Sequence, residues 1–217
     1  MLPKIRINPV LAPIDRVIEV LGGVIMVLTF TNALSVSHGG NPDLRAMLIG
    51  SLGCNLAWGI IDGVMYLMNC LAGRGHRLDV LRAMRGANDP EAQRILIAEL
   101  PEALAEQVSS IELAPIIRRV RELPEPPLRP RLSPDEWRGA LRIFGLVFFS
   151  TLPVVLPFLL IPQTTLALRI SNLVAIGLLF LTGYLFGLHT RHNPWRLGIV
   201  MVFIGCLLTT VAFCLGG

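Results

Sequence analysis

The chain has few charged residues and almost no lysine. Asp, Glu, Lys and Arg make up 16 % of its 217 residues, whereas an ordinary soluble domain carries about 25 %. Lys4 is the only lysine among 19 basic residues, and no basic stripe interleaved with aromatic side chains is present. The first deficit argues against a soluble globular protein, and the second argues against a nucleic-acid-binding protein.

Common catalytic motifs are absent as well. The sequence contains no His-Glu-x-x-His, no Gly-x-Ser-x-Gly, no phosphate-binding glycine loop and no Cys-x-x-Cys. Four cysteines lie in apolar segments without the spacing of metal ligands, so we expect buried thiols rather than disulfides or zinc ligands: Cys54, Cys70, Cys206 and Cys214. We therefore expect neither an enzyme nor a permanently bound cofactor.

What the chain does contain is long apolar segments. It is 53 % hydrophobic, and about 20 consecutive apolar residues are enough to span a bilayer as a helix. Five segments meet this requirement, at residues 17–37, 46–72, 139–161, 168–188 and 195–215. No cleavable signal peptide is visible, so the first segment should remain as a membrane helix. The predicted fold class is all-α, an integral membrane protein with five transmembrane helices.

Charge is concentrated between the second and third spans. Residues 73–138 hold 11 of the 15 acidic and 11 of the 19 basic residues, which predicts a small, water-exposed helical domain. We expect helices at 78–84, at 89–109 with a break at Pro101, and at 111–123, followed by a stiff Pro-rich connector at 124–134. The chain thus divides into an N-terminal arm (1–16), two spans (17–72), this insert (73–138) and three further spans (139–217).

The basic residues also predict the orientation of the chain. With the N-terminus in the cytoplasm, 17 basic residues lie inside, against two outside, Arg45 and Arg169. The positive-inside rule favours this arrangement. We therefore expect a multi-pass protein of the cytoplasmic (inner) membrane, with the N-terminus and the insert inside and the C-terminus outside.

The second span carries one carboxylate, Asp62, inside an apolar segment. At helical spacing Asn55, Gly59 and Asp62 share one stripe. A charge near the middle of the membrane costs about 3 kcal/mol even on the lenient insertion scale, so Asp62 must face protein, water or a cation. Two interpretations remain open: an ion pathway, or a protonated or hydrogen-bonded residue that packs helices together.

Other candidate residues lie in the first span and in the insert. Glu19 and Met26 share a face of the first span, and the Gly22–Gly23 pair would allow another helix to approach closely. Because Glu19 lies near the start of the span, its side chain could equally reach out into solvent. In the insert, Glu99, Glu102 and Glu106 follow i, i+3, i+7 spacing. Such a row suits a divalent cation such as Mn2+ or Fe2+, and it is equally typical of a solvated acidic face.

In its layout, and in the segments RVIEVLGGVIMVLTF and NLAWGIIDGVMYL, the chain resembles the vacuolar iron transporter family. That family has five transmembrane helices with a cytoplasmic, carboxylate-rich helical domain between the second and third. Its first helix carries an Asp–Gly pair, which Gly22–Gly23 matches with the Asp lost. Asp62 and Met65 lie near the family's second-helix ligand positions, and Glu99-x-x-Glu102 matches its soluble-domain motif.

The resemblance implies a homodimer with an ion pathway between the first helices. Because the first-helix Asp is missing, either Asp62 or Glu19 replaces it or transport has been lost. The leading hypothesis is a divalent cation (Fe2+ or Mn2+) transporter whose insert captures the ion. The alternative is a non-transporting membrane scaffold whose insert binds a partner protein.

Overall fold

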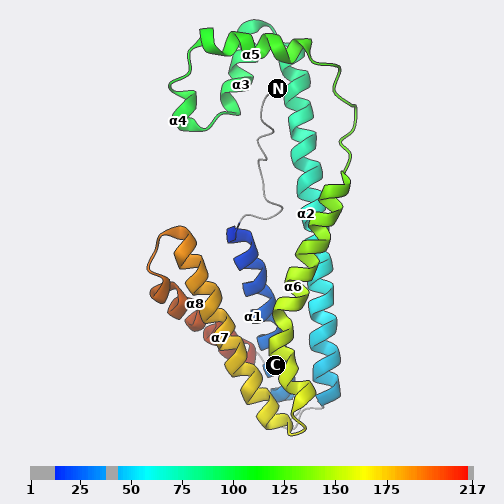
Figure 1. Cartoon of the computed structure of the whole chain (residues 1–217), viewed down its shortest axis with the longest axis vertical. Helices are drawn as coiled ribbons and strands as arrows, with labels where there is room; N and C mark the ends of the chain where they lie inside the picture. Colours follow the sequence, from blue (N-terminus) through cyan, green and yellow to red (C-terminus); the bar gives the residue numbers. More distant parts are fainter. Residues whose placement is uncertain (1–12, 38–43, 215–217) are drawn as a thin grey trace. The chain divides into compact units, whose positions relative to one another are not determined.

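The computed structural model describes residues 13–37 and 44–214 (Figure 1). Over these ranges the chain forms helices and no strand, so the all-α prediction is confirmed. The helices are α1 (Pro13–Ser37), α2 (Leu44–Gly86), α3 (Asp89–Ala98), α4 (Glu102–Ala105), α5 (Ser110–Glu122), α6 (Pro134–Leu160), α7 (Thr164–Thr190) and α8 (Pro194–Cys214). Of the predicted N-terminal arm, residues 1–12 lie outside the described ranges, and residues 13–16 already belong to α1.

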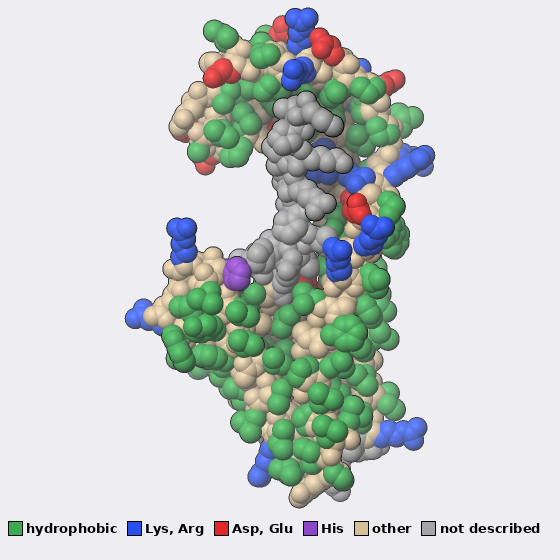
Figure 2. Space-filling view, in the orientation of Figure 1, with side chains coloured by type: hydrophobic (Ala, Val, Ile, Leu, Met, Phe, Trp, Pro, Cys, Tyr) green, Lys and Arg blue, Asp and Glu red, His purple; other side chains and the backbone are tan. Residues whose placement is uncertain are grey.

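Two compact units make up the chain. The apolar unit comprises Met1–Met65 and Trp137–Gly217, and the charged unit comprises Tyr66–Glu136. On the face shown in Figure 2, hydrophobic side chains cover most of the apolar unit. A surface of this kind suits a lipid environment, because soluble monomers rarely expose such large continuous apolar patches.

Four helices are long and apolar enough to cross a membrane within the described ranges. They contain the segments Arg45–Gly86, Pro134–Leu160, Thr164–Thr190 and Pro194–Val211. The corresponding apolar segment of α1, Val17–Ala33, is shorter. The structure therefore supports a multi-pass membrane protein, and the fifth span remains a prediction for α1.

The core of the apolar unit lies where α1, α6 and α7 meet. Its fully buried side chains come from all three helices: Val24, Val27, Leu28, Val154, Val155, Ala175 and Leu179. Pro153 and Pro157 lie inside α6, which remains helical through both positions.

Glycines bring α7 and α8 into close contact. A Cβ atom on Gly183 would lie 2.6 Å from the carbonyl oxygen of Leu197, and one on Gly187 would lie 2.6 Å from the Cα of Pro194. Only residues without a side chain allow two helix backbones to approach this closely. The turn between the helices is fixed by Asn193, whose side-chain oxygen accepts a hydrogen bond from the backbone N–H of Trp195 at 3.1 Å.

Helix α2 corrects one prediction for the insert. The expected separate helix at 78–84 is the continuation of the second span, because α2 runs without interruption from Leu44 to Gly86. Gly73 and Gly75 lower helix propensity without removing a backbone donor, so they do not end the helix. The first proline after Leu44 is Pro90.

The charged unit has a small core of its own. Met84, Ala92, Leu113 and Ile117 are buried together where α2, α3 and α5 meet. The expected helix at 89–109 ends at Ala98 and a short helix restarts at Glu102, so the predicted break at Pro101 is confirmed. The N-cap of α3 is Asn88, whose side chain accepts a hydrogen bond from the backbone N–H of Glu91.

Capping residues start the other two long helices near this unit. The carboxylate of Glu112 accepts hydrogen bonds from the backbone N–H and the hydroxyl of Ser109, both at 2.9 Å. These bonds favour the charged form and lower the pKa of Glu112. Glu136 makes the same two bonds with Ser133 at the start of α6.

The cysteines are free, and they are less buried than expected. Cys54 and Cys70 are half-buried, whereas Cys206 and Cys214 are exposed on α8. The expectation of buried thiols is therefore wrong for the last two. Their segment is apolar because α8 presents much of its surface outward, and hydropathy alone does not separate a buried helix face from one that faces lipid.

Candidate functional site

A stripe of polar side chains runs along α2 inside the apolar unit. Ser51 and Asn55 are fully buried, and Asp62 is 9 % exposed. At about 100° per residue, the positions of these three residues fall within roughly 40° of one another around the helix. Polar groups on one helix face, surrounded by apolar ones, mark either a pathway or an interhelical hydrogen-bond network.

Asn55, one residue of this stripe, is hydrogen-bonded to α6. The side-chain amide of Asn55 donates to the carbonyl oxygen of Phe148 at 3.1 Å and to the hydroxyl of Thr151. Thr151 is also fully buried, and its hydroxyl donates to the Phe148 carbonyl at 2.9 Å. Asn55 therefore links α2 to α6 by hydrogen bonds, as expected for a residue that packs helices together.

Asp62 has a different environment from Asn55. Its Oδ2 atom is buried and has no hydrogen-bond partner among the described residues, and the same holds for the Asn55 Oδ1 and Ser51 Oγ atoms. Close helix packing accounts for the burial. A Cβ atom on Gly59 would lie 3.0 Å from the ring of Phe144, and one on Gly63 would lie 3.3 Å from the carbonyl of Ala140. Helix α6 thus covers α2 on both sides of Asp62.

Glu19 on α1 lies at the same depth as Asp62. Three contacts define an antiparallel register between α1 and α2: Gly22 with Trp58, Met26 with Cys54, and Phe30 with Gly50. In each pair the two residue numbers add up to 80, so Glu19 lies opposite position 61, next to Asp62. Glu19 is half-buried and takes part in an interaction of its own.

Two sulfur atoms lie about two helical turns from the carboxylates, Met26 on α1 from Glu19 and Cys54 on α2 from Asp62. The thiol of Cys54 donates to the thioether sulfur of Met26 at 3.4 Å. Met26 was identifiable from the sequence as a candidate ligand, whereas Cys54 was expected only as a buried thiol. The register between the two helices, which the sequence does not reveal, is what brings this soft-ligand pair together.

Met65 and the Gly22–Gly23 pair do not have the surroundings expected from the sequence. Met65 is 55 % exposed, so within one chain its side chain is outside the buried stripe that holds Asp62. Gly23 is buried against α6, where a Cβ atom would meet Thr151 at 2.9 Å, and Gly22 faces Trp58. The close approach that the glycine pair allows is therefore used inside the chain, by α6 and α2.

A second polar contact lies between α1 and α7. Asn32 and Asn172 exchange two side-chain hydrogen bonds, at 3.1 and 3.0 Å. Neither asparagine was identifiable from the sequence as a candidate functional residue. No signal in a single sequence links residues 140 positions apart, because both asparagines are ordinary polar residues within apolar segments.

The acidic row of the insert is not assembled on one helix. Glu99 follows the end of α3, Glu102 begins α4, and Glu106 follows the end of α4. The carboxylate of Glu99 pairs with His76 at 3.0 Å. Across residues 13–37 and 44–214, no group of three or more His, Cys, Asp or Glu side chains is placed to hold a metal ion. One helix face could hold all three carboxylates only if the helix continued through Pro101, and the break at Pro101 separates them.

Comparisons with known proteins add independent information. A family model described as "VIT family" matches residues 82–217. Vacuolar iron transporter 1 of Arabidopsis thaliana is 29 % identical over 129 residues, which are 54 % of this chain and 52 % of that protein. The chain thus spans about half the length of this curated relative. The acidic row lies inside the matched range of the family model, and the polar stripe of α2 lies before it.

Proposed function

The chain belongs to the VIT family, and from this premise we propose that it transports a divalent metal cation, Fe2+ or Mn2+, across the cytoplasmic membrane. The family and the named relative support metal transport in general. The choice of Fe2+ or Mn2+ rests on the ligands available. Carboxylates combined with thioether and thiol sulfur suit borderline divalent cations better than Mg2+ or Ca2+.

The buried Asp62 carboxylate is the observation that supports the proposal most strongly. Asn55 donates two hydrogen bonds to α6 through its amide nitrogen, although its own Oδ1 atom is buried without a partner. Asp62 also keeps a buried oxygen without a partner, and this oxygen belongs to an acid that carries a full negative charge when it is ionised. A carboxyl group in an apolar helix bundle is stable only if it is protonated or, when ionised, if it lies beside a cation or water. A cation in transit provides that charge.

The neighbouring residues extend this position into a pathway. Glu19 lies at the depth of Asp62 on the adjacent helix, so the two carboxylates can neutralise one divalent cation between them. Met26 and Cys54 are in contact about two turns further along the same two helices, α1 and α2. In this arrangement Glu19 and Asp62 together replace the family's first-helix Asp.

We further propose that the protein works as a homodimer and that Glu99, Glu102 and Glu106 capture the ion in the cytoplasm. One chain does not bring these three side chains together, so tight binding requires ligands from a second copy. Met65 is consistent with this arrangement, because its exposed side chain is available to a partner helix.

Uptake into liposomes tests the function directly. The purified full chain, reconstituted into liposomes, should admit Fe2+ or Mn2+ faster than protein-free liposomes do and should exclude Mg2+. Metal entry is read from a fluorescent indicator trapped inside. Rates equal to those of protein-free liposomes for both metals would contradict the proposal.

The scaffold remains the second candidate, and the hydrogen-bonded polar residues favour it. Asn55 with Thr151, and Asn32 with Asn172, join helices through hydrogen bonds that require no transported ion. If all intramembrane polar residues served this purpose, the liposomes would take up no metal, and replacing Asp62 would weaken only the fold.

A further inference from the structure

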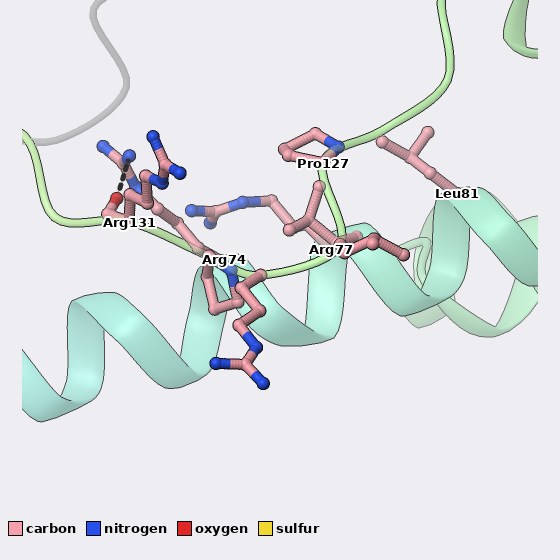
Figure 3. Close-up of a pocket in the computed structure, with 9 residues that line it drawn as sticks. Arg74, Arg77, Leu81, Pro127 and Arg131 are labelled. Carbon is pink, nitrogen blue, oxygen red and sulfur yellow. Dashed lines mark hydrogen bonds between the residues drawn. The ribbon is translucent and has the colours of Figure 1, made fainter.

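The charged unit contains a cavity of about 770 Å3 that the proposed transport mechanism does not use. One wall is α2 and the other is the Pro-rich connector. Figure 3 shows Arg74, Arg77 and Leu81 on α2, with Pro127 and Arg131 on the connector beside it. The lining residues are Arg74, Arg77, Leu78, Leu81, Pro127, Leu128, Arg129, Pro130 and Arg131.

The lining of this cavity is strongly basic. It includes four arginines and no carboxylate. Arg74 is engaged, because it pairs with Glu136 at 2.9 Å and donates to the carbonyl oxygen of Arg131 at 2.7 Å. Within the described part of the chain, the side chains of Arg77, Arg129 and Arg131 have no recorded hydrogen bond or ion pair. Three guanidinium groups are therefore available to an anion.

The two walls are held together independently of any ligand. Arg74 bonds the connector near Arg131 and Ser133. Further along α2, Arg85 donates to the carbonyl oxygens of Leu123 and Pro124. Prolines stiffen the segment between these two attachments. The cavity is thus part of the fold, with its arginines already placed on both sides.

The sequence position of the cavity indicates which anion it meets. Arg74 and Arg77 follow Ala72, the end of the predicted second span, by two and five residues. At 1.5 Å per residue these positions lie about 3 and 8 Å beyond the span, which is the depth of the polar headgroup layer. Leu128 on the connector is 88 % exposed, and an apolar side chain next to arginines suits the boundary between headgroups and acyl chains.

We propose that this cavity binds the phosphate group of an anionic phospholipid. Arginine is the preferred partner of phosphate, because its planar group donates two parallel hydrogen bonds. Basic clusters directly after a membrane helix recognise anionic lipids in this way. The inference goes beyond metal transport, and it requires only that α2 crosses the bilayer up to Ala72, as the proposed topology states.

Native mass spectrometry of the full chain in detergent tests the proposal. Phosphatidylglycerol is titrated against wild type and against the double variant Arg77→Gln/Arg129→Gln, which removes one charge from each wall. Each basic residue beside an anionic membrane surface strengthens binding about fivefold, so the double variant should bind on the order of thirtyfold more weakly. The control Arg94→Gln/Arg119→Gln removes two arginines of the same unit that do not line the cavity, and it should bind like wild type.

Three outcomes would overturn the proposal. An equal loss in both double variants would show diffuse charge attraction instead of a site. Equal binding of phosphatidylcholine would show that the anionic headgroup is not selected. Binding of inorganic phosphate or glycerol 3-phosphate as tight as that of the lipid would make the ligand a soluble phosphate. If the double variant loses its helical circular dichroism signal, Arg77→Gln and Arg129→Gln are tested singly, and each should weaken binding about fivefold.

Discussion

At the scale of single residues, Asp62 is the side chain of the apolar unit whose burial costs the most free energy. An ionised carboxylate in the middle of a membrane costs about 3 kcal/mol or more, and an unsatisfied buried polar group adds about 1–3 kcal/mol. Nothing in the described residues offsets the second term for the Oδ2 atom. A residue retained only for packing would gain from a hydrogen-bond partner such as the one that Asn55 has in Thr151.

Replacing Asp62 by Asn separates the two candidate functions. The change removes the charge and keeps nearly the same volume, so insertion should be unchanged or improved. Metal uptake by liposomes at equal protein content should fall at least tenfold, about 1.4 kcal/mol in the barrier, because the cation loses a full negative charge.

The matched control for this exchange is Asp79→Asn. Asp79 is a surface carboxylate of the charged unit that pairs with Arg82, so its exchange alters charge equally and leaves the pathway intact. Uptake by the Asp79→Asn protein should equal that of wild type. Equal, metal-dependent uptake by the Asp62→Asn protein would instead remove Asp62 from the pathway.

Some of this stripe could be predicted from sequence, and some could not. Asp62 and Asn55 were identifiable because polar residues are costly in an apolar segment. Ser51 and Thr151 belong to the same buried group and gave no signal, since small hydroxyl residues are common in membrane spans. The exposure of Met65 depends on which face of α2 is covered by α6, and this depends on the tertiary structure.

At the scale of helices, hydropathy predicted where helices lie better than where they end. The predicted spans at 168–188 and 195–215 agree with α7 and α8 to within a few residues. The predicted end of the second span, Ala72, falls 14 residues before the end of α2 at Gly86, because the change from apolar to charged composition marks a change of environment and leaves the helical backbone intact. The break at Pro101 was predictable, since proline removes a backbone donor.

The α7–α8 contact gives a prediction about stability. In Gly183→Ala the new methyl group would lie 2.6 Å from the Leu197 carbonyl oxygen and 2.9 Å from the Cα of Gly198. The two helices would have to separate, and overpacking of this kind costs about 1–3 kcal/mol. Thermal unfolding of the detergent-solubilised variant should begin at a lower temperature than that of wild type.

Gly177→Ala is the control on the same helix. No heavy atom lies within 4 Å of a Cβ built at Gly177, and alanine is a better helix former than glycine. This variant should unfold at the wild-type temperature or slightly above it. A decrease equal to that of Gly183→Ala would show that any methyl group on α7 is harmful and that the close contact is not the cause.

The acidic row across α3 and α4 gives a second prediction at this scale. Because the three carboxylates are not gathered within one chain, the protein should bind Mn2+ weakly in calorimetry, and tighter binding should require the dimer. Exchanging Glu99, Glu102 and Glu106 together for Gln should abolish this heat signal. The control exchanges three other surface glutamates for Gln: Glu91, Glu122 and Glu125. If the first triple variant leaves the isotherm unchanged, the insert does not capture metal through these residues.

At the scale of the whole molecule, the layout was more predictable than the site. Alternation between apolar segments and one charged insert can be read from composition alone. Contacts between helices depend on register and on glycine positions far apart in the chain, which a single sequence does not reveal. The orientation in the membrane rests on charge and is still to be measured.

Accessibility of single cysteines measures that orientation. Single cysteines are introduced at three described positions of a protein whose four native cysteines are replaced by serine: Gln163, Glu125 and Asn193. The positive-inside rule places Gln163, between α6 and α7, outside the cell, and it places the other two in the cytoplasm. A membrane-impermeant maleimide added to intact cells should therefore label only Gln163→Cys, and the other two should react after the membrane is opened. Labelling of Glu125→Cys in intact cells would place the charged unit outside, and would overturn both the capture of metal from the cytoplasm and the orientation on which it depends.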